Sequence, residues 1–146
     1  ARPTDELLNV LHSKALQAVI LCPSNPYLSI DPILAVPGMR AALRASGVPI
    51  IAVSPLIGGR AVKGPTAKIM QELGIEASPA SIASHYAGLI DGLVLDHADA
   101  AHAEALAMPV LCTDTLMSTL ADRERVAAAA LELATTLSRS RAQSRA

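Results

Sequence analysis

The chain has 146 residues, a formal net charge of −1 and 51% apolar residues. This length fits one compact domain with a sizeable core, and the near-neutral charge argues against general attraction to nucleic acid or an anionic membrane. The chain has two tyrosines, no tryptophan and no phenylalanine, so aromatic platforms for stacked nucleobases are scarce. No apolar run approaches the ~20 residues that span a bilayer, and no signal peptide is evident behind the acidic start "TDELL".

Helix and strand signals alternate along the chain. A helix is predicted after Thr4, where acidic residues mark a helix start. Continuous apolar runs bounded by Pro and Gly indicate buried strands, and glycines mark helix ends. The predicted strands are 17–22, 48–54, 89–96 and 108–114; the predicted helices are 39–46, 66–74, 78–88, 98–107 and a long C-terminal region with Leu116, Leu120, Val126, Ala130, Leu133 and Leu137 on one side. This alternation predicts an α/β layered fold with a mostly parallel sheet flanked by helices.

One α/β domain is expected over residues 1–138, followed by a disordered basic tail over 139–146. Cys22 and Cys112 both end strand-like apolar runs. We interpret them as buried, reduced thiols of a cytoplasmic protein in preference to a disulfide.

The first candidate binding loop is "CPSNPYLSIDPILAVPG" (22–38), which follows the first strand. Ligands of open parallel sheets bind beyond the carboxyl ends of the strands, so the loops after residues 22, 54, 96 and 114 are the candidates. Ser24, Asn25 and Ser29 offer hydroxyl and amide groups there, and prolines stiffen the segment. Alternatively, the same side chains form Asx- and Ser-turns that satisfy their own backbone, and both interpretations can hold together.

The second candidate loop, "GGRAVKGPTAK", has the composition of a phosphate cradle. Gly58, Gly59 and Gly64 allow the backbone N–H groups to approach a ligand closely, and a helix that starts after this loop favours an anion. Arg60 and Lys63 add positive charge. The loop is not a Walker A motif, because the lysine precedes the second glycine of the pattern. The alternative is a surface loop with turn glycines.

Charge is partitioned along the chain. Residues 32–71 contain no acid and five basic residues, whereas residues 72–122 contain eight acids and no Lys or Arg. This predicts a cationic patch, with ordinary solvated helix faces as the alternative for Arg44 and Lys68.

The remaining loops carry weaker signals. "LDHADAAH" gathers two Asp and two His, but we expect Asp99 to cap a helix and do not expect a metal site. Asp114 and Thr115 are equally well explained as ligand contacts or as helix caps. No pairing of residues suggests a covalent nucleophile. The residues alone therefore indicate an α/β domain that binds a phosphorylated small molecule.

Three stretches resemble one family: "PSNPYLSIDPILAVPGMR" (23–40), "PIIAVSPLIGGRAVKGP" (49–65) and "PVLCTDTLM" (109–117), with "SHYAGLIDGLVLDHADA" between the last two. In order and spacing they resemble the 2-phospho-L-lactate transferases of coenzyme F-420 biosynthesis. The resemblance implies a Rossmann-like fold, a homodimer and magnesium-assisted transfer. A phospholactyl or phosphoenolpyruvyl group would pass from a guanosine diphosphate-linked donor to the deazaflavin precursor Fo, with release of GMP. Lys63 and Arg60 would act in catalysis, and the polar loops would hold the donor.

The resemblance covers only the C-terminal half of such a transferase. It implies that the acidic magnesium ligands and deazaflavin contacts lie in the family's N-terminal half, so no metal ligand is expected among the residues here. Two further hypotheses remain: a non-catalytic regulator of related fold that binds a nucleotide or nucleotide sugar, and a domain that chiefly supplies a dimer interface.

Overall fold

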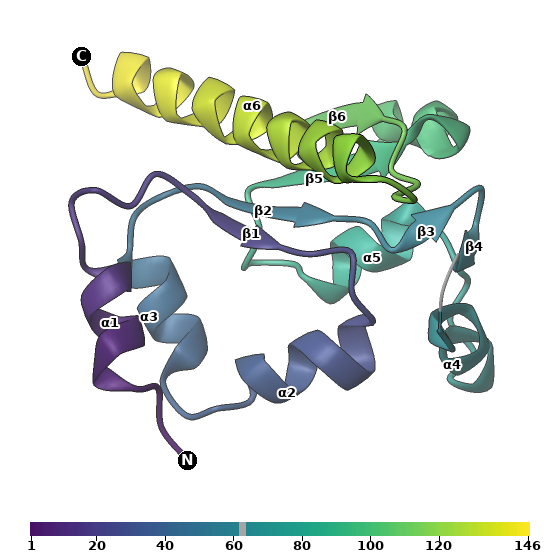
Figure 1. Cartoon of the computed structure of the whole chain (residues 1–146), viewed down its shortest axis with the longest axis horizontal. Coiled ribbons are helices and arrows are strands. Elements are labelled where there is room, and N and C mark those ends of the chain that lie inside the picture. The colour runs from purple at the N-terminus through teal and green to yellow at the C-terminus, as the bar shows by residue number, and fades with distance from the viewer. Residues whose placement is uncertain (62–63) are drawn as a thin grey trace.

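A computed structural model describes residues 1–61 and 64–146 of the chain (Figure 1). Within these residues a parallel sheet has the strand order β1-β2-β5-β6. The strands are β1 (Val19–Leu21), β2 (Ile50–Val53), β5 (Gly92–Asp96) and β6 (Val110–Thr113). Each strand is shorter than its predicted range, and all neighbouring pairs run parallel. The predicted α/β fold with a mostly parallel sheet is confirmed.

The apolar strand sequences build a core on each face of the sheet. Successive side chains of a strand point to opposite faces, so Ile50 and Ala52 join one buried cluster and Ile51 and Val53 the other. Because both faces are covered, the strands read as continuous apolar runs without polar alternation. This explains why β2 and β5 are fully buried along their length.

Helices cover the two faces unequally. Figure 1 shows α6 (Leu120–Ser144) lying along one face of the sheet, with several shorter helices on the opposite side. The helices of that opposite side are α1 (Asp5–Leu11), α2 (Asp31–Leu34), α3 (Met39–Ala45) and α5 (Pro79–His85). None of the described helices is long and apolar enough to cross a membrane.

Helix α6 (Leu120–Ser144) starts at a capping box. The Thr119 hydroxyl accepts the Asp122 N–H, and the Asp122 carboxylate accepts the Thr119 N–H. Hydrogen bonds to this carboxylate from the Thr119 N–H, the Arg125 guanidinium and the Ser118 N–H hold the pKa of Asp122 well below its ordinary value. Val126, Ala130 and Leu133 are buried as predicted, but Leu116 and Leu120 are 46% and 68% exposed because they precede or begin the helix.

The C-terminal residues differ from the sequence prediction. Helix α6 continues to Ser144, whereas the sequence predicts a disordered tail from residue 139. Ala and Arg are good helix formers, and Arg141 ties this part of the helix to the Gly47 carbonyl and to Asp91. The hydroxyls of Ser140 and Ser144 donate to carbonyls one turn earlier.

Two predicted loops contain regular structure. Residues 26–34 form a short π-helix, η1 (Pro26–Ile30), followed directly by α2. The predicted glycine loop contains an antiparallel hairpin, β3 (Leu56–Ile57) and β4 (Arg60–Ala61), before α4 (Thr66–Glu72). The helix predicted over 98–107 is a 3-10 helix, η2 (His97–Ala105).

The cysteine prediction is half right. Both thiols are free, but Cys22 is exposed and Cys112 is half-buried, so neither is fully buried. Burial, followed by the negative charges of Asp96 and Asp99, raises the pKa of the Cys112 thiol.

Candidate functional site at the carboxyl edge of the sheet

The carboxyl ends of the parallel strands meet at one edge of the sheet, on the right in Figure 1, where the β3–β4 hairpin also lies. A pocket of about 120 Å³ opens there. It is lined by Pro23, Ser54, Pro55, Ile57, Thr115, Leu116 and Met117. The first, second and fourth candidate loops therefore converge on one hollow, as expected for an open parallel sheet.

Two buried hydroxyl residues line this pocket. Ser54 is 2% exposed, and its Oγ accepts the Leu56 N–H at 3.2 Å. Thr115 is 6% exposed, and its N–H and its hydroxyl both donate to Oδ2 of Asp96, at 2.8 and 3.0 Å. Thr115 thus lies in the pocket wall with its orientation fixed.

Asp96 fixes the loop that follows β6. Its Oδ1 accepts the Ala98 N–H at 2.8 Å, while its Oδ2 accepts both groups of Thr115. Burial alone would raise the pKa of Asp96, but the hydrogen bonds from Ala98 and Thr115 outweigh it, and the pKa lies below its ordinary value. Hydrogen bonds to the charged form of a carboxyl have this effect. Asp96, at the end of β5, is therefore an anchor that sequence reasoning missed.

Asp99 does not cap a helix, and that prediction is wrong. Asp96 is the N-cap of η2, and Asp99 turns inward to a position only 2% exposed. Its Oδ2 accepts the Gly58 N–H at 3.0 Å and its Oδ1 accepts the Gly59 N–H at 3.2 Å. No local sequence pattern indicates this contact, which joins residues 40 and 41 positions apart. The sequence predicts that N–H groups of this loop bind a phosphate. The N–H groups of Gly58 and Gly59 do not serve that purpose, because they donate to Asp99.

Arg60 follows this turn directly and is exposed on β4. It pairs with Ile57 in the hairpin. Directly opposite residues of antiparallel strands project to the same face, so Arg60 shares a face with Ile57, which lines the pocket. Lys63 lies outside the described residues. Gly64 is exposed with a φ of 75°, just before α4.

The first loop contributes a rigid wall. The amide oxygen of Asn25 accepts the N–H groups of Tyr27 and Leu28, both at 3.0 Å, and caps η1. This is the predicted Asx-turn. The amide nitrogen of Asn25 is buried and has no hydrogen-bond partner among the described residues. Ser24 is half-buried and Ser29 is exposed on η1.

Asp114 acts as a local brace. Its Oδ1 accepts the Leu116 N–H at 3.0 Å, and its Oδ2 lies 3.4 Å from the Arg125 guanidinium. Arg125 also donates to the carbonyls of Asp114 and Leu116. Arg125 holds this loop against the first turns of α6, a role that its place in a charged helix face does not reveal.

The described basic residues of the acid-free stretch do not gather in one patch. Arg44 on α3 donates to the Gly88 carbonyl, and Lys68 on α4 pairs with Glu72 at 3.8 Å. Figure 1 shows α3 and α4 at opposite ends of the molecule. The alternative explanation, solvated helix faces, therefore applies to Arg44 and Lys68, and Arg60 is left at the carboxyl edge.

The described residues do not fit a magnesium site. None of their His, Cys, Asp and Glu side chains form a group of three that could hold a metal ion. Asp96 and Asp99 accept main-chain N–H groups, and Asp114 is paired with Arg125. His97 and His102 are exposed on η2.

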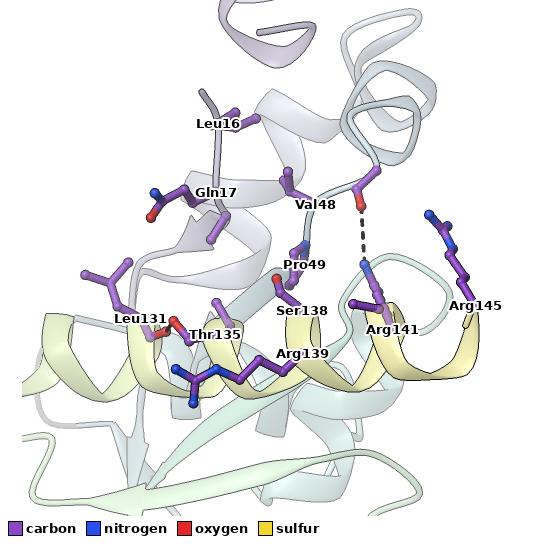
Figure 2. Close-up of a pocket in the computed structure, with 14 residues that line it drawn as sticks. Leu16, Gln17, Val48, Pro49, Leu131, Thr135, Ser138, Arg139, Arg141 and Arg145 are labelled. Atoms are coloured by element: carbon purple, nitrogen blue, oxygen red, sulfur yellow. Dashed lines mark hydrogen bonds between the residues drawn. The ribbon is translucent and has the colours of Figure 1, made fainter. Parts of the chain in front are cut away.

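A larger hollow, of about 510 Å³, lies at the opposite end of the sheet (Figure 2). It is bordered by residues that precede β1 and β2 and by the last turns of α6, among them Thr135, Ser138 and Arg139. Arg141 reaches across it to the Gly47 carbonyl at 3.4 Å. No described residue of the candidate loops borders this hollow. It lies at the end where the strands of the parallel sheet begin, so we do not assign it as the site.

A parallel sheet covered by helices, with polar loops and a pocket at its carboxyl edge, defines a Rossmann-like α/β domain. The model of the family described as "2-phospho-L-lactate transferase CofD" matches residues 1–136. The chain belongs to this family, and the predicted resemblance is confirmed.

Curated relatives carry transferase names. The chain is 37% identical over 138 residues to the phosphoenolpyruvate transferase of Streptomyces coelicolor, covering 92% of this chain and 43% of the relative. It is also 37% identical over 127 residues to the 2-phospho-L-lactate transferase of Methanocaldococcus jannaschii, covering 87% and 40%. The chain thus spans about two fifths of the length of these relatives.

Proposed function

We propose that this chain forms the donor-binding part of a transferase of coenzyme F-420 biosynthesis. The transferase would move a phospholactyl or phosphoenolpyruvyl group from a guanosine diphosphate-linked donor to Fo and release GMP. One observation carries the proposal: three stretches far apart in the sequence, each with family-like motifs, contribute Pro23, Ser54 and Thr115 to the walls of one pocket.

The chemistry of the transfer needs positive charge at this edge. A hydroxyl of Fo attacks the phosphorus that carries the lactyl or enolpyruvyl group and loses its proton. The bond from that phosphorus to the bridging oxygen breaks, and GMP leaves with the electron pair. Cations that neutralise the bridging oxygen as it departs with GMP lower the barrier. Arg60 shares a face with Ile57 of the pocket, and the sequence places Lys63 three residues further on. No step is assigned to magnesium here, because the described residues do not fit it.

The polar loops would orient the donor. The hydroxyls of Ser54 and Thr115 line the pocket and are held by Leu56 and Asp96. The amide nitrogen of Asn25 has no hydrogen-bond acceptor among the described residues. An oxygen of the bound nucleotide would accept its hydrogen bond. Hydrogen-bonding groups that are already fixed in place bind an anion with a smaller loss of conformational entropy than mobile groups do.

Calorimetric titration tests the proposal. The chain is titrated with GDP and magnesium, then with Fo, and a UDP-sugar serves as the competing ligand. We expect saturable binding of GDP. Preference for the UDP-sugar would favour a non-catalytic regulator, and binding of none of these ligands would contradict donor binding by this chain.

A homodimer is also implied by the resemblance. Size-exclusion chromatography with light scattering measures the mass in solution. A clean monomer would count against a dimer built by this part of the transferase.

A further inference from the structure

We propose that Asp99 is a positioning residue of the donor site. Its buried carboxylate fixes the Gly58–Gly59 turn and thereby sets where Arg60 meets the anionic part of the ligand. The inference rests on the proposed function, because the ligand concerned is the nucleotide donor.

The contact between Asp99 and the turn uses both carboxylate oxygens. Oδ2 accepts the Gly58 N–H at 3.0 Å, and Oδ1 accepts the Gly59 N–H at 3.2 Å. Asp99 is 2% exposed, so these bonds are shielded from competing water. Hydrogen bonds to a charged acceptor are stronger than those between neutral groups.

The turn needs such support. Gly58 and Gly59 have φ values of 57° and 71°, as in a two-residue type I′ hairpin turn. The hairpin has only two paired residues in each strand, and a short isolated hairpin is marginally stable in water. A Cβ on Gly59 would lie 3.2 Å from the Ala77 carbonyl oxygen, so the turn is also seated closely against the loop that precedes α5.

The turn determines the position of Arg60. Arg60 follows Gly59 and pairs with Ile57, which lines the pocket. Without the carboxylate, the turn samples more conformations, and ordering Arg60 on a ligand costs more free energy. Asp99 therefore acts on the ligand through Arg60 and does not touch it.

Asp91 supplies a matched control at the other end of β5. Its Oδ2 accepts the Ile50 N–H at 2.8 Å, and its Oδ1 pairs with Arg141. It braces the main chain as Asp99 does, but it borders the amino end of the sheet. Substitution there affects folding stability without altering the candidate site.

The test is a double-mutant cycle on GDP affinity, measured by calorimetry on the whole chain. We expect Asp99→Asn and Arg60→Ala each to weaken GDP about tenfold, and the double variant to be about as weak as either one, because coupled residues are not additive. Asp91→Asn is expected to stay within about twofold of the wild type.

A second substitution that restores the turn distinguishes a positioning role of Asp99 from a purely stabilising one. Asn-Gly is the preferred pair for a type I′ turn, and among the residues that the structure describes a Cβ at Gly58 meets only the Ala98 Cβ, at 3.7 Å. Adding Gly58→Asn to Asp99→Asn is therefore expected to restore most of the lost affinity, and this variant also serves if Asp99→Asn alone folds poorly. In Asp99→Asn, amide hydrogen exchange of Gly58 and Gly59 is expected to accelerate.

Three results would overturn the inference. They are additive losses in the cycle, wild-type GDP affinity in Asp99→Asn, and unchanged exchange at Gly58 and Gly59 in that variant. Failure of the wild-type chain to bind GDP is a different outcome: it removes the proposed function and, with it, the role of Asp99 in binding.

Discussion

At the amino end of the sheet, Asp91 accepts the Ile50 N–H and also pairs with Arg141. At the carboxyl end, the hydrogen bonds that Asp96 and Asp99 accept from described residues come from N–H and hydroxyl groups. The first arrangement uses a cation to satisfy the acid. The second leaves the neighbouring cation available, since Arg60 has no salt bridge among the described residues.

The comparison explains why one end suits an anionic ligand. Buried carboxylates at the carboxyl end are satisfied by the main chain, so they fix loops without neutralising the exposed arginine. At the amino end the hollow of Figure 2 has several arginines, but Arg141 is already paired and bonded to Gly47. The two ends therefore differ less in pocket size than in whether their arginines are already paired.

The largest expected effect is on catalysis. Lys63→Ala should slow transfer by about 2–4 kcal/mol of barrier, because a cation at the leaving group stabilises the transition state. GMP release from the donor in the presence of Fo measures this. Lys68→Ala is the control, since Lys68 is exposed and paired with Glu72. Unchanged turnover in Lys63→Ala would remove Lys63 from the mechanism.

The bracing carboxylates should matter for stability. Asp96→Ala leaves the N–H groups of Ala98 and Thr115 without their acceptor and should lower the free energy of unfolding by about 2–4 kcal/mol. Urea denaturation measures the loss. Asp114→Ala, at an exposed carboxylate, should cost about 1 kcal/mol or less. Equal losses in the two variants would contradict the anchoring role of Asp96.

Acid should reproduce part of that loss. The pKa of Asp96 is lower in the folded chain than its ordinary value of 3.8. The stabilisation is therefore fully present above that value and is lost as the pH falls further, through the folded pKa. The difference in unfolding free energy between the wild type and Asp96→Asn should shrink between pH 7 and pH 3. A difference that grows toward pH 3 would contradict the assigned direction.

A packing change under α6 should have a smaller effect, confined to stability. A Cβ on Gly92 would lie 2.9 Å from Leu133 Cδ2 and 3.3 Å from Ile51 Cδ1. Gly92→Ala should thus cost about 1–3 kcal/mol through overpacking, measured by urea denaturation. Combination with Leu133→Ala should cost less than the sum of the single changes, and strict additivity would show that the two groups do not meet.

The smallest expected effect on stability is the sharpest probe of the first loop. Asn25→Ser keeps an oxygen that can cap η1 and places no charge where the amide nitrogen is buried. The free energy of unfolding should therefore change by no more than about 0.5 kcal/mol, whereas Asn25→Ala should lose about 1 kcal/mol. Because we propose that the amide nitrogen contacts the nucleotide, Asn25→Ser should still weaken GDP several-fold in calorimetry. Full GDP affinity in Asn25→Ser would assign Asn25 to capping alone.

Much of the fold was readable from the sequence because it is encoded locally. The apolar runs around Ile51 and Val94 predict the strands, and glycines predict the helix ends. The alternation of helices and strands predicts a parallel sheet, and a parallel sheet places the binding loops at the carboxyl ends of its strands. The β3–β4 hairpin could also have been predicted from the sequence, since a Gly-Gly pair between short apolar runs favours a type I′ turn.

Other features depend on contacts between distant residues. The bonds from Asp99 to the glycine turn and from Asp96 to Thr115 join residues 40 and 19 positions apart. No local pattern distinguishes such a carboxylate from a helix cap. The extension of α6 to Ser144 likewise depends in part on Arg141, whose partners lie 94 and 50 positions away.

Mapping of GDP by amide chemical-shift perturbation on the isotopically labelled chain tests the central claim most directly. We expect the largest shifts at the amides of Ser54, Ile57 and Thr115, which line the pocket at the carboxyl edge. Shifts confined to Gly47, Thr135 and Ser138, around the hollow at the amino end, would contradict the assignment of the site.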